Sequence, residues 1–517
     1  AIYRITPELM DDFRMQGCIS MENGEVAALY SLAKEHKLPI GVLLGTAFLI
    51  PILSLKNDKF ATYTAFTGCL AAMIITLSMV PQVVSEGRIV YHMESWKAPF
   101  GITVVIDNLS IVLSFLSILI TFLVIIFSYR YVKERRTKYY SLLCLALVGA
   151  LGMIVTGDIF NMFVYLEVMS VASYALIAFN KDRPALEASI KYLIMGSLAT
   201  SLLLLGIAFL YGITGTLNMA DISVKISSMT NPLVGISFGL ILTGMLVKAG
   251  LIPFHAWLPD SYQASPSPVS SIFAGVTTNT GIYAILRVGF LVFNSHHALL
   301  WLMTFLGVIS MVAGAFLALV QTNLKRLLGY SSISQMGYIA MSVGLGTSLG
   351  ITGGILHIIN QAIIKSLLFL CAAFIVYQTK TDNIYEISGH FKFQPVVAYS
   401  FLIGGLSLVG LPLFNGFVSK WLIYIATLQI NPVLTVVALM VTVITLAYIL
   451  KAFYLIFLGN VKPVASEKKI PITMRIPMIT LVILIIILGI MPSATIKLSE
   501  AMTLSLERTK YIAEVLR

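Results

Sequence analysis

The residues of this chain best suited to chemistry are ionisable groups that lie inside long apolar stretches. They are one acid, four lysines and one histidine: Glu167, Lys191, Lys248, Lys365, Lys420 and His357. A lysine at the centre of a membrane helix costs about 2.5 to 3.5 kcal/mol on insertion scales, so four unpaired lysines would cost roughly 10 to 14 kcal/mol. That sum equals the stability of a whole domain. These lysines must therefore contact water or ionic partners.

A lysine beside a carboxylate in a partly dry cavity can carry a proton reversibly. Burial lowers the pKa of a lysine and a nearby carboxylate raises it, so a change in their separation changes whether the lysine keeps its proton. Glu167 and Lys248 are the candidate pair. For one pair alone, a static ion pair that fixes two helices is the alternative. Four lysines, with His357 eight residues before Lys365, favour a proton relay across the membrane.

The elements that position these residues are membrane-spanning helices. The chain has 517 residues, of which 58% are hydrophobic and 11% charged, far outside the range of soluble globular domains. Apolar runs of about 20 residues, enough to cross a bilayer, predict an all-α polytopic membrane protein with about fourteen transmembrane helices. These begin near Leu38, Phe60, Ile106, Tyr139, Ile159, Ala185, Pro232, Pro268, Leu300, Leu324, Ile351, Pro395, Asn431 and Arg475.

The distribution of basic residues predicts the topology. The net charge of +11 does not indicate nucleic-acid binding, because the charges gather in loops on one side of the predicted membrane. If the basic loop 129–138 is cytoplasmic, its side carries seventeen lysines and arginines and the opposite loops carry three. The positive-inside rule then places both termini outside the cell membrane. Arg287 and Lys451 lie near span ends, where we expect them to snorkel to the interface.

The sequence indicates no redox or metal chemistry of the chain's own. The four cysteines have no CxxC spacing. Only His357 lies well inside a span, whereas a membrane haem usually needs two axial histidines. We therefore expect no cofactor, no metal site and no catalytic residue.

Two apolar runs are interrupted by similar breaks, which suggests an internal repeat. Gly250, Leu251 and Phe254 align with Gly410, Leu411 and Phe414, and the stretch 201–209 aligns with 366–374. The predicted organisation is an extramembrane segment (1–37), helices 1–3 (38–138), a first repeat of helices 4–8 (139–294), a second repeat of helices 9–13 (295–459), and helix 14 with a tail (460–517). Five helices per repeat make the second copy inverted, as in many transporters with broken helices at their ion sites.

From about Ile106 to Ile496 the sequence resembles the antiporter-like subunits of respiratory complex I and the D-type subunits of Mrp cation/proton antiporters. The stretches that carry the resemblance are "FVYLEVMSVASYALI", "LVKAGLIPFHAWLPD", "LHIINQAIIKSLLFL" and "GLPLFNGFVSKW". Group 4 membrane-bound hydrogenases contain similar subunits. The resemblance implies that Glu167 is the carboxylate partner of Lys248 on a broken seventh helix, and that Lys420 is the terminal lysine of the second half. It makes His357 and Lys365 intermediates and Lys191 an uptake or modulating group.

The sequence departs from the family at three relay positions. Asn279 stands where the family often has a lysine, and Gln335 and Gln361 stand where some members have a histidine. Either hydrogen-bonded water conducts past these amides or the relay is interrupted.

The resemblance implies a subunit of a larger membrane complex that moves H⁺, or exchanges H⁺ for Na⁺. Its partners would be further antiporter-like subunits, small membrane subunits and a peripheral redox arm. A non-conducting scaffold subunit and a stand-alone solute transporter are the alternatives. The parent complex stays open among an antiporter, a hydrogenase, a quinone reductase and a sulfur reductase.

Overall fold

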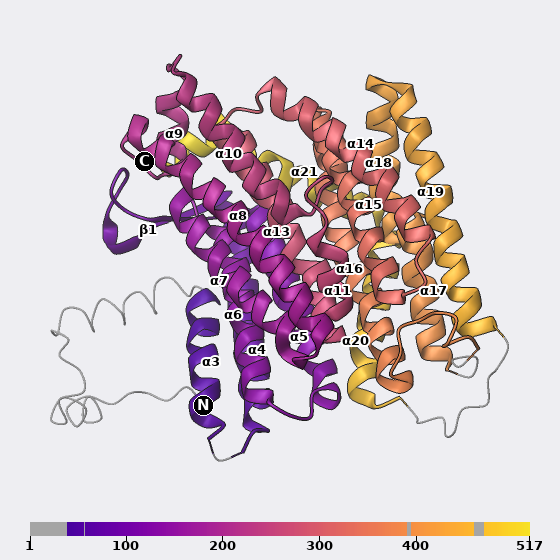
Figure 1. Ribbon diagram of the computed structural model, residues 1–517. Coiled ribbons are helices and arrows are strands. Elements are labelled where there is room, and N and C mark those ends of the chain that lie inside the picture. The colour runs from indigo at the N-terminus through magenta and orange to yellow at the C-terminus, as the bar shows by residue number, and fades with distance from the viewer. Residues whose placement is uncertain (1–38, 56, 390–393, 460–469) are drawn as a thin grey trace, which may run out of the picture.

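Helices make up most of the described residues (Figure 1). The computed structural model describes residues 39–55, 57–389, 394–459 and 470–517, so the predicted extramembrane segment 1–37 lies outside the described residues. Within the described ranges, eleven helices are long and apolar enough to cross a membrane, and Pro39–Leu53 and Pro395–Val409 are shorter apolar helices. The protein is thus an all-α, multi-pass membrane protein, and the count of fourteen spans stays a prediction.

The first half of the chain runs from α3 to the segment that ends at Val292. It comprises α3 (Pro39–Leu53), α4 (Phe60–Glu86), α5 (Asn108–Tyr131), α6 (Arg136–Val155), α7 (Ile159–Ile177), α8 (Arg183–Thr214), α9 (Met219–Ile226), α10 (Pro232–Ala249), α11 (Trp257–Ala264), α12 (Ser267–Ile272) and α13 (Thr278–Leu286). Two π-helical stretches, Phe273–Thr277 and Arg287–Val292, flank α13. Such stretches are frequent at functional sites.

The second half contains the longest buried helix, α16. It comprises α14 (His297–Leu319), α15 (Leu324–Gly344), α16 (Ser348–Thr379), α17 (Pro395–Val409), α18 (Asn415–Ile430), α19 (Pro432–Phe453), α20 (Ile472–Ile490), α21 (Pro492–Leu504) and α22 (Arg508–Val515). The most apolar windows of α16 and of Ser267–Val292 are completely buried, whereas that of α20 is 28% buried. α16 and α12–α13 therefore form the centre of the bundle, and α20 lies at its edge.

Polar N-caps explain where several of these helices begin. The side chains of Asp107, Asp158, Asp182, Asn231, Asn323 and Asn431 accept hydrogen bonds from the first-turn backbone N–H groups of α5, α7, α8, α10, α15 and α19. Backbone groups that have no helical partner must be satisfied in this way near a membrane. The caps therefore fix the helix ends that carry the loops.

Two helices end at glycines inside the bundle. Gly250, with φ +68°, ends α10, and Gly410, with φ +90°, ends α17. In both places the glycine N–H donates to carbonyls three and four residues back, and the N–H of the next leucine donates to the carbonyl five residues back. Glycine is required because its left-handed conformation strains other residues. Both predicted breaks are therefore real helix ends with the same cap.

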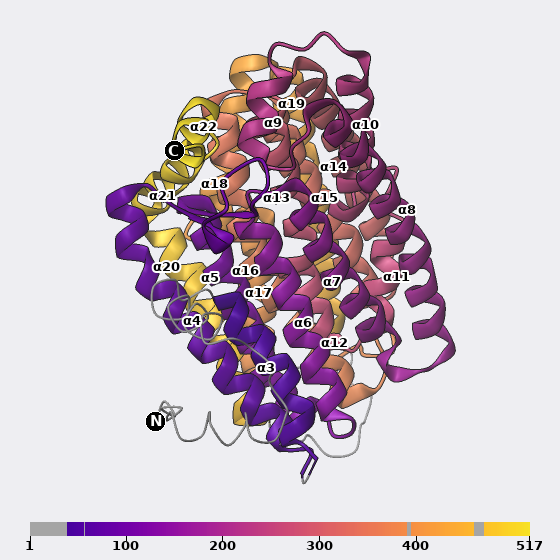
Figure 2. The same ribbon diagram turned by 90° about the vertical axis from the view of Figure 1, so that its left-hand side faces the viewer.

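One β-hairpin interrupts the helical pattern. β1 (Arg88–His92) pairs antiparallel with β2 (Thr103–Asp107). A span is predicted to begin near Ile106, whereas the structure places Ile106 and Asp107 in β2 and starts α5 at Asn108. The C-terminal end lies beside the hairpin and α9 (Figures 1 and 2). Arg508 of α22 donates to the Oγ and the carbonyl oxygen of Ser223 in α9.

Candidate ion-translocation site

Lys248 is a buried cation held by neutral groups. It lies in the last turn of α10, next to the break, and is 2% exposed. Its Nζ donates to Ser170 Oγ at 2.7 Å and to Tyr174 OH at 3.4 Å, both on α7. The same nitrogen lies 5.0 Å from the ring centroid of Tyr192 on α8. Hydroxyl acceptors and aromatic faces stabilise an ammonium without neutralising it.

A glycine on α8 makes room for this ammonium. A Cβ at Gly196 would lie 2.0 Å from Tyr174 OH and 3.1 Å from Lys248 Nζ. Because no side chain fits there, the position must stay small for Lys248 to reach α7. The geometry therefore depends on three helices, α7, α8 and α10.

Glu167 lies near Lys248 but does not form an ion pair with it in this conformation. It is half-buried on α7, three residues before Ser170 and therefore on the same face of the helix. Among the described residues no carboxylate oxygen lies within 4.0 Å of Lys248 Nζ. Ser170 thus occupies the position at the ammonium that the sequence analysis gave to Glu167. The feature of the sequence that could have identified Ser170 is its position three residues after Glu167.

A small apolar void adjoins Lys248. Its volume is about 10 Å³, and apart from Lys248 it is lined by apolar residues of α6, α7, α8, α10 and α13. That volume is close to the minimum for one water molecule. Constrictions of this kind can gate ion passage by wetting and drying. Water access to Lys248 is therefore narrow in this conformation.

The second half of the bundle holds a buried histidine and two buried lysines. His357 lies on α16 with Nδ1 2.9 Å from Ser419 Oγ and Nε2 3.1 Å from Gln335 Oε1. Lys420 donates to the carbonyl of Val409, the last residue of α17, at 3.2 Å. Its Nζ also lies 4.6 Å from the ring centroid of Tyr338, which in turn is 6.1 Å from the ring of His357. His357 and Lys420 thus share one aromatic neighbour.

Lys365 is the third member of this group and lies eight residues after His357 on α16. It is fully buried and donates to Ser331 Oγ, and to the Leu328 carbonyl at 3.2 Å. In the part of the chain that the structure describes, neither Lys365 nor Lys420 has a carboxylate within ion-pair distance. Lys365 is bonded to a hydroxyl and a carbonyl oxygen instead, and Lys420 to a carbonyl oxygen.

Lys191 lies apart from these buried groups. Its side chain is 49% exposed and pairs with Glu187 at 2.8 Å and Asp260 at 2.9 Å. Asp260 also pairs with Arg326. These four side chains line an open cavity of about 260 Å³. The sequence predicts that Lys191 lies as deep as Lys248, whereas the structure places it in a surface cluster of charges.

The three amides at relay positions are buried and only partly hydrogen-bonded. Asn279 donates from Nδ2 to the Gly275 carbonyl at 2.8 Å, while its Oδ1 has no protein partner among the described residues. Gln335 Nε2 and both amide atoms of Gln361 also have none. Buried polar atoms of this kind are ordinarily satisfied by ordered water.

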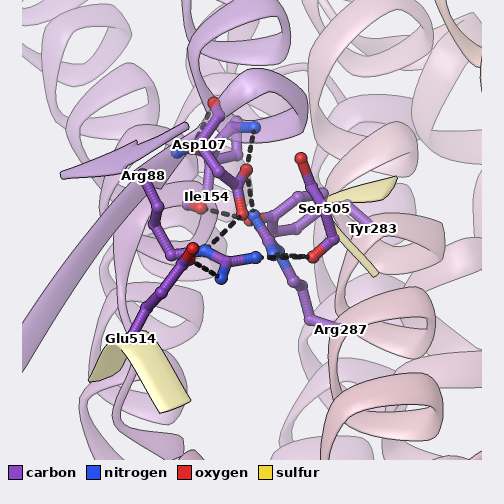
Figure 3. A network of polar contacts seen from close by, with 8 residues as sticks. Arg88, Asp107, Ile154, Tyr283, Arg287, Ser505 and Glu514 are labelled. Atoms are coloured by element: carbon purple, nitrogen blue, oxygen red, sulfur yellow. Dashed lines mark hydrogen bonds and ion pairs between the residues drawn. The ribbon is translucent and has the colours of Figure 1, made fainter. Parts of the chain in front are cut away.

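A network of buried charges at the C-terminal end of α13 was not anticipated from the sequence (Figure 3). Asp107 Oδ1 lies 2.6 Å from Arg287 Nη2, and Asp107 Oδ2 lies 3.6 Å from Arg88 Nε. Arg88 also pairs with Glu514, and both arginines donate to the Ser505 carbonyl. Arg287 is 5% exposed, so the expectation that it snorkels to the interface is wrong. The missed signal was Asp107 itself, three residues before Ser110 at the start of an apolar run.

The guanidinium groups of Arg287 and Arg88 determine the protonation state of Asp107. Burial raises the pKa of Asp107, but the charges of Arg287 and Arg88 and the hydrogen bond from Arg287 outweigh it, so the pKa lies below its ordinary value. The carboxylate is therefore ionised and binds the hairpin to the eighth predicted span.

Two family models together match most of the chain. The model described as "NADH:quinone oxidoreductase/Mrp antiporter, TM" matches residues 156–445. The model described as "NADH-ubiquinone oxidoreductase chain 4, amino terminus" matches residues 40–156. The first match alone covers more than half of the chain and includes every residue of the predicted relay.

Known proteins agree with these matches over nearly the full length. The D-type subunit of the Na⁺/H⁺ antiporter of Alkalihalophilus pseudofirmus is 33% identical, covering 90% of this chain and 96% of that protein. A chain of the membrane-bound sulfane sulfur reductase, an archaeal respiratory membrane complex, is 33% identical with a TM-score of 0.88, covering 93% of this chain and 99% of that chain. A chain of the Mrp complex from Dietzia sp. is 26% identical with a TM-score of 0.87, covering 93% and 98%. The chain therefore belongs to the NADH:quinone oxidoreductase/Mrp antiporter family of membrane proteins.

Proposed function

We propose that this chain is the ion-translocating, antiporter-like subunit of a multisubunit membrane complex, and that it moves protons, or exchanges them for Na⁺, through Glu167, Lys248, His357, Lys365 and Lys420. The observation that carries the proposal is the state of Lys248. It is buried at a helix break, and its hydrogen-bond partners among the described residues are all neutral, with Glu167 one helical turn from its main acceptor. A charge held in this way can gain or lose its carboxylate partner by a small movement of α7.

In the second half of the proposed relay, protons pass through water molecules and neutral side chains. Asn279, Gln335 and Gln361 each leave at least one buried amide atom without a protein partner. Water bound to these atoms would link the Lys248 region to His357 and Lys365, and this supports conduction rather than interruption. The same amides would support a non-conducting scaffold if protons do not pass them, and the transport measurements below separate the two.

The proposed topology rests on the internal repeat and on the distribution of basic residues between the loops. We propose two inverted five-helix repeats, 139–294 and 295–459, and both termini on the outer side of the cell membrane. The matching caps at Gly250 and Gly410 support the repeats. Partner subunits are expected because the similar solved chains come from multisubunit complexes.

Glu167→Gln in the complete reconstituted complex tests the proposal. The amide keeps the shape but removes the charge that draws the proton to Lys248. We therefore expect ion transport to fall by at least about tenfold, less than the roughly 10² to 10⁴ that a positioned proton-transfer group itself contributes. Transport is measured as acidification of proteoliposomes with a pH-sensitive dye. Glu500→Gln, an exposed acid on α21, is the matched control and should transport as the wild type does. Equal transport by both variants would remove Glu167 from the relay.

For Lys191 we propose a role in proton uptake from the charged cavity. Its loss should slow transport less than Glu167→Gln does. An exposed ion pair contributes at most about 1 kcal/mol, and a tenfold change in rate needs about 1.4 kcal/mol. Lys191→Ala should therefore slow proton uptake by less than tenfold, and the loss should shrink at high salt, where exposed charges are screened. A loss as large as that of Glu167→Gln would contradict a surface role.

A further inference from the structure

Both ring nitrogens of His357 are bonded to neutral side chains. Nε2 faces Gln335 Oε1 at 3.1 Å and Nδ1 faces Ser419 Oγ at 2.9 Å. A carbonyl oxygen can only accept a hydrogen bond, whereas a hydroxyl can donate or accept. Gln335 therefore selects a protonated Nε2, and Ser419 is compatible with either state of Nδ1.

The hydroxyl of Ser419 has a second acceptor for its proton. Ser419 Oγ lies 3.2 Å from the Gly416 carbonyl and accepts a hydrogen bond from Asn360 Nδ2 at 3.0 Å. Since the amide donates, Asn360 takes one lone pair of Ser419 and offers no acceptor for its proton. That proton can point only to His357 Nδ1 or to the Gly416 carbonyl. Ser419 therefore has two states that differ by a rotation of one hydroxyl.

A closed set of hydrogen bonds fixes which way the Asn360 amide points. Asn360 Nδ2 also donates to the Asn415 carbonyl at 2.7 Å, and Asn360 Oδ1 accepts from Asn415 Nδ2 at 3.0 Å. Asn415 Oδ1 in turn accepts from Ser407 Oγ at 2.7 Å. All of these residues are buried, and their bonds join α16 to both sides of the α17–α18 break. A flipped Asn360 amide would lose these bonds, so its NH₂ group is held toward Ser419.

We propose that Ser419, oriented by Asn360, is a positioning residue that makes Nδ1 the nitrogen at which His357 gains and loses a proton. The proposal rests on the relay through His357. In the neutral state Nε2 carries the proton and Ser419 donates to Nδ1. When a hydronium ion arrives, Ser419 Oγ takes a proton from it and gives its own proton to Nδ1, and a water molecule is left. The hydroxyl keeps one proton, which now points to the Gly416 carbonyl, and the imidazolium donates from both nitrogens.

Solid-state NMR of the reconstituted complex with ¹⁵N-labelled histidine in this chain tests the inference. The His357 signals are those missing from His357→Gln. We expect an unprotonated Nδ1 and a protonated Nε2 in the wild type. Ser419→Ala should shift the Nδ1 signal, because Nδ1 loses its hydrogen-bond donor, while the proton stays on Nε2, which faces Gln335 Oε1. Ser419→Thr, which keeps the hydroxyl, should restore the wild-type Nδ1 signal. Ser342→Ala removes a buried hydroxyl that bonds the Gly350 carbonyl and should leave the His357 signals unchanged.

Transport gives the second readout. Ser419→Ala should slow proton transport roughly tenfold, because one hydrogen bond to a charged group is lost, and Ser419→Thr should recover most of the rate. A wild-type Nδ1–H tautomer, or a Ser419→Ala pattern equal to the wild type, would overturn the inference. The NMR pattern does not depend on transport, so it can hold even if the transport measurements show that the relay does not operate.

Discussion

Lys248→Ala is expected to abolish ion transport by the assembled complex, with a loss of about 100-fold or more. The reason is that Lys248 is a buried cation next to the α10 break and near a carboxylate, and a positioned proton-transfer group contributes about 10² to 10⁴ in rate. The measurement is dye-reported acidification of proteoliposomes that contain the whole complex. Lys497→Ala removes an exposed lysine of α21 and should leave the rate unchanged.

Lys248→Arg separates a proton relay from a static ion pair. Arginine keeps the positive charge but does not release its proton in proteins. A relay should therefore fail in Lys248→Arg as in Lys248→Ala, whereas a static pair should keep most of its function. Wild-type transport by Lys248→Ala would remove Lys248 from the pathway. If Asn279→Lys also changed nothing, the scaffold function would be favoured.

Hydropathy and the pattern of breaks were enough to predict the helical architecture and the buried lysines. The glycines that end α10 and α17 were visible as Gly-Leu pairs inside apolar runs, because a helix end in the bundle needs a left-handed residue. Burial of Lys365 and Lys420 followed from their position in the middle of long apolar segments. These features depend on local sequence, so the apolar runs and the glycines within them are enough to predict them.

What could not be predicted depends on contacts between distant segments. Ser170 and Ser419 are small polar residues, common in apolar helices, and only the packing of α7 on α10 and of α16 on α18 shows that they bond Lys248 and His357. Lys191 was expected to be buried because its segment is apolar, yet Asp260, 69 residues away, draws it into a surface cluster. The hairpin was missed because its strands are short and adjoin an apolar run.

The charge network beside α13 predicts the largest effect on stability. Asp107→Asn removes the carboxylate that both Arg287 and Arg88 face, which leaves two buried guanidinium groups with only Glu514 as an acid in the network. Breaking a buried pair in this way costs about 3 to 5 kcal/mol, because the remaining charge is not compensated. The measurement is the thermal unfolding midpoint of the purified complex. Asp221→Asn, which breaks an i, i+4 pair with the partly exposed Lys225, should cost no more than about 1 kcal/mol.

The pH dependence of the stability difference between the wild type and Asp107→Asn tests the role of the Asp107 charge a second time. The pKa of Asp107 is lower in the folded protein than its ordinary value of 3.8, so its charge contributes stability that is fully present above pH 3.8 and is lost as the pH falls through the folded pKa. The gap between wild type and Asp107→Asn should therefore be constant between pH 5 and 7 and should narrow only below about pH 3.8. Adding Arg287→Gln to Asp107→Asn should recover part of the loss, because it removes one uncompensated charge. If the double variant is less stable than Asp107→Asn by the full effect of Arg287→Gln alone, the two side chains act independently. The network would then not be what holds the hairpin to α13.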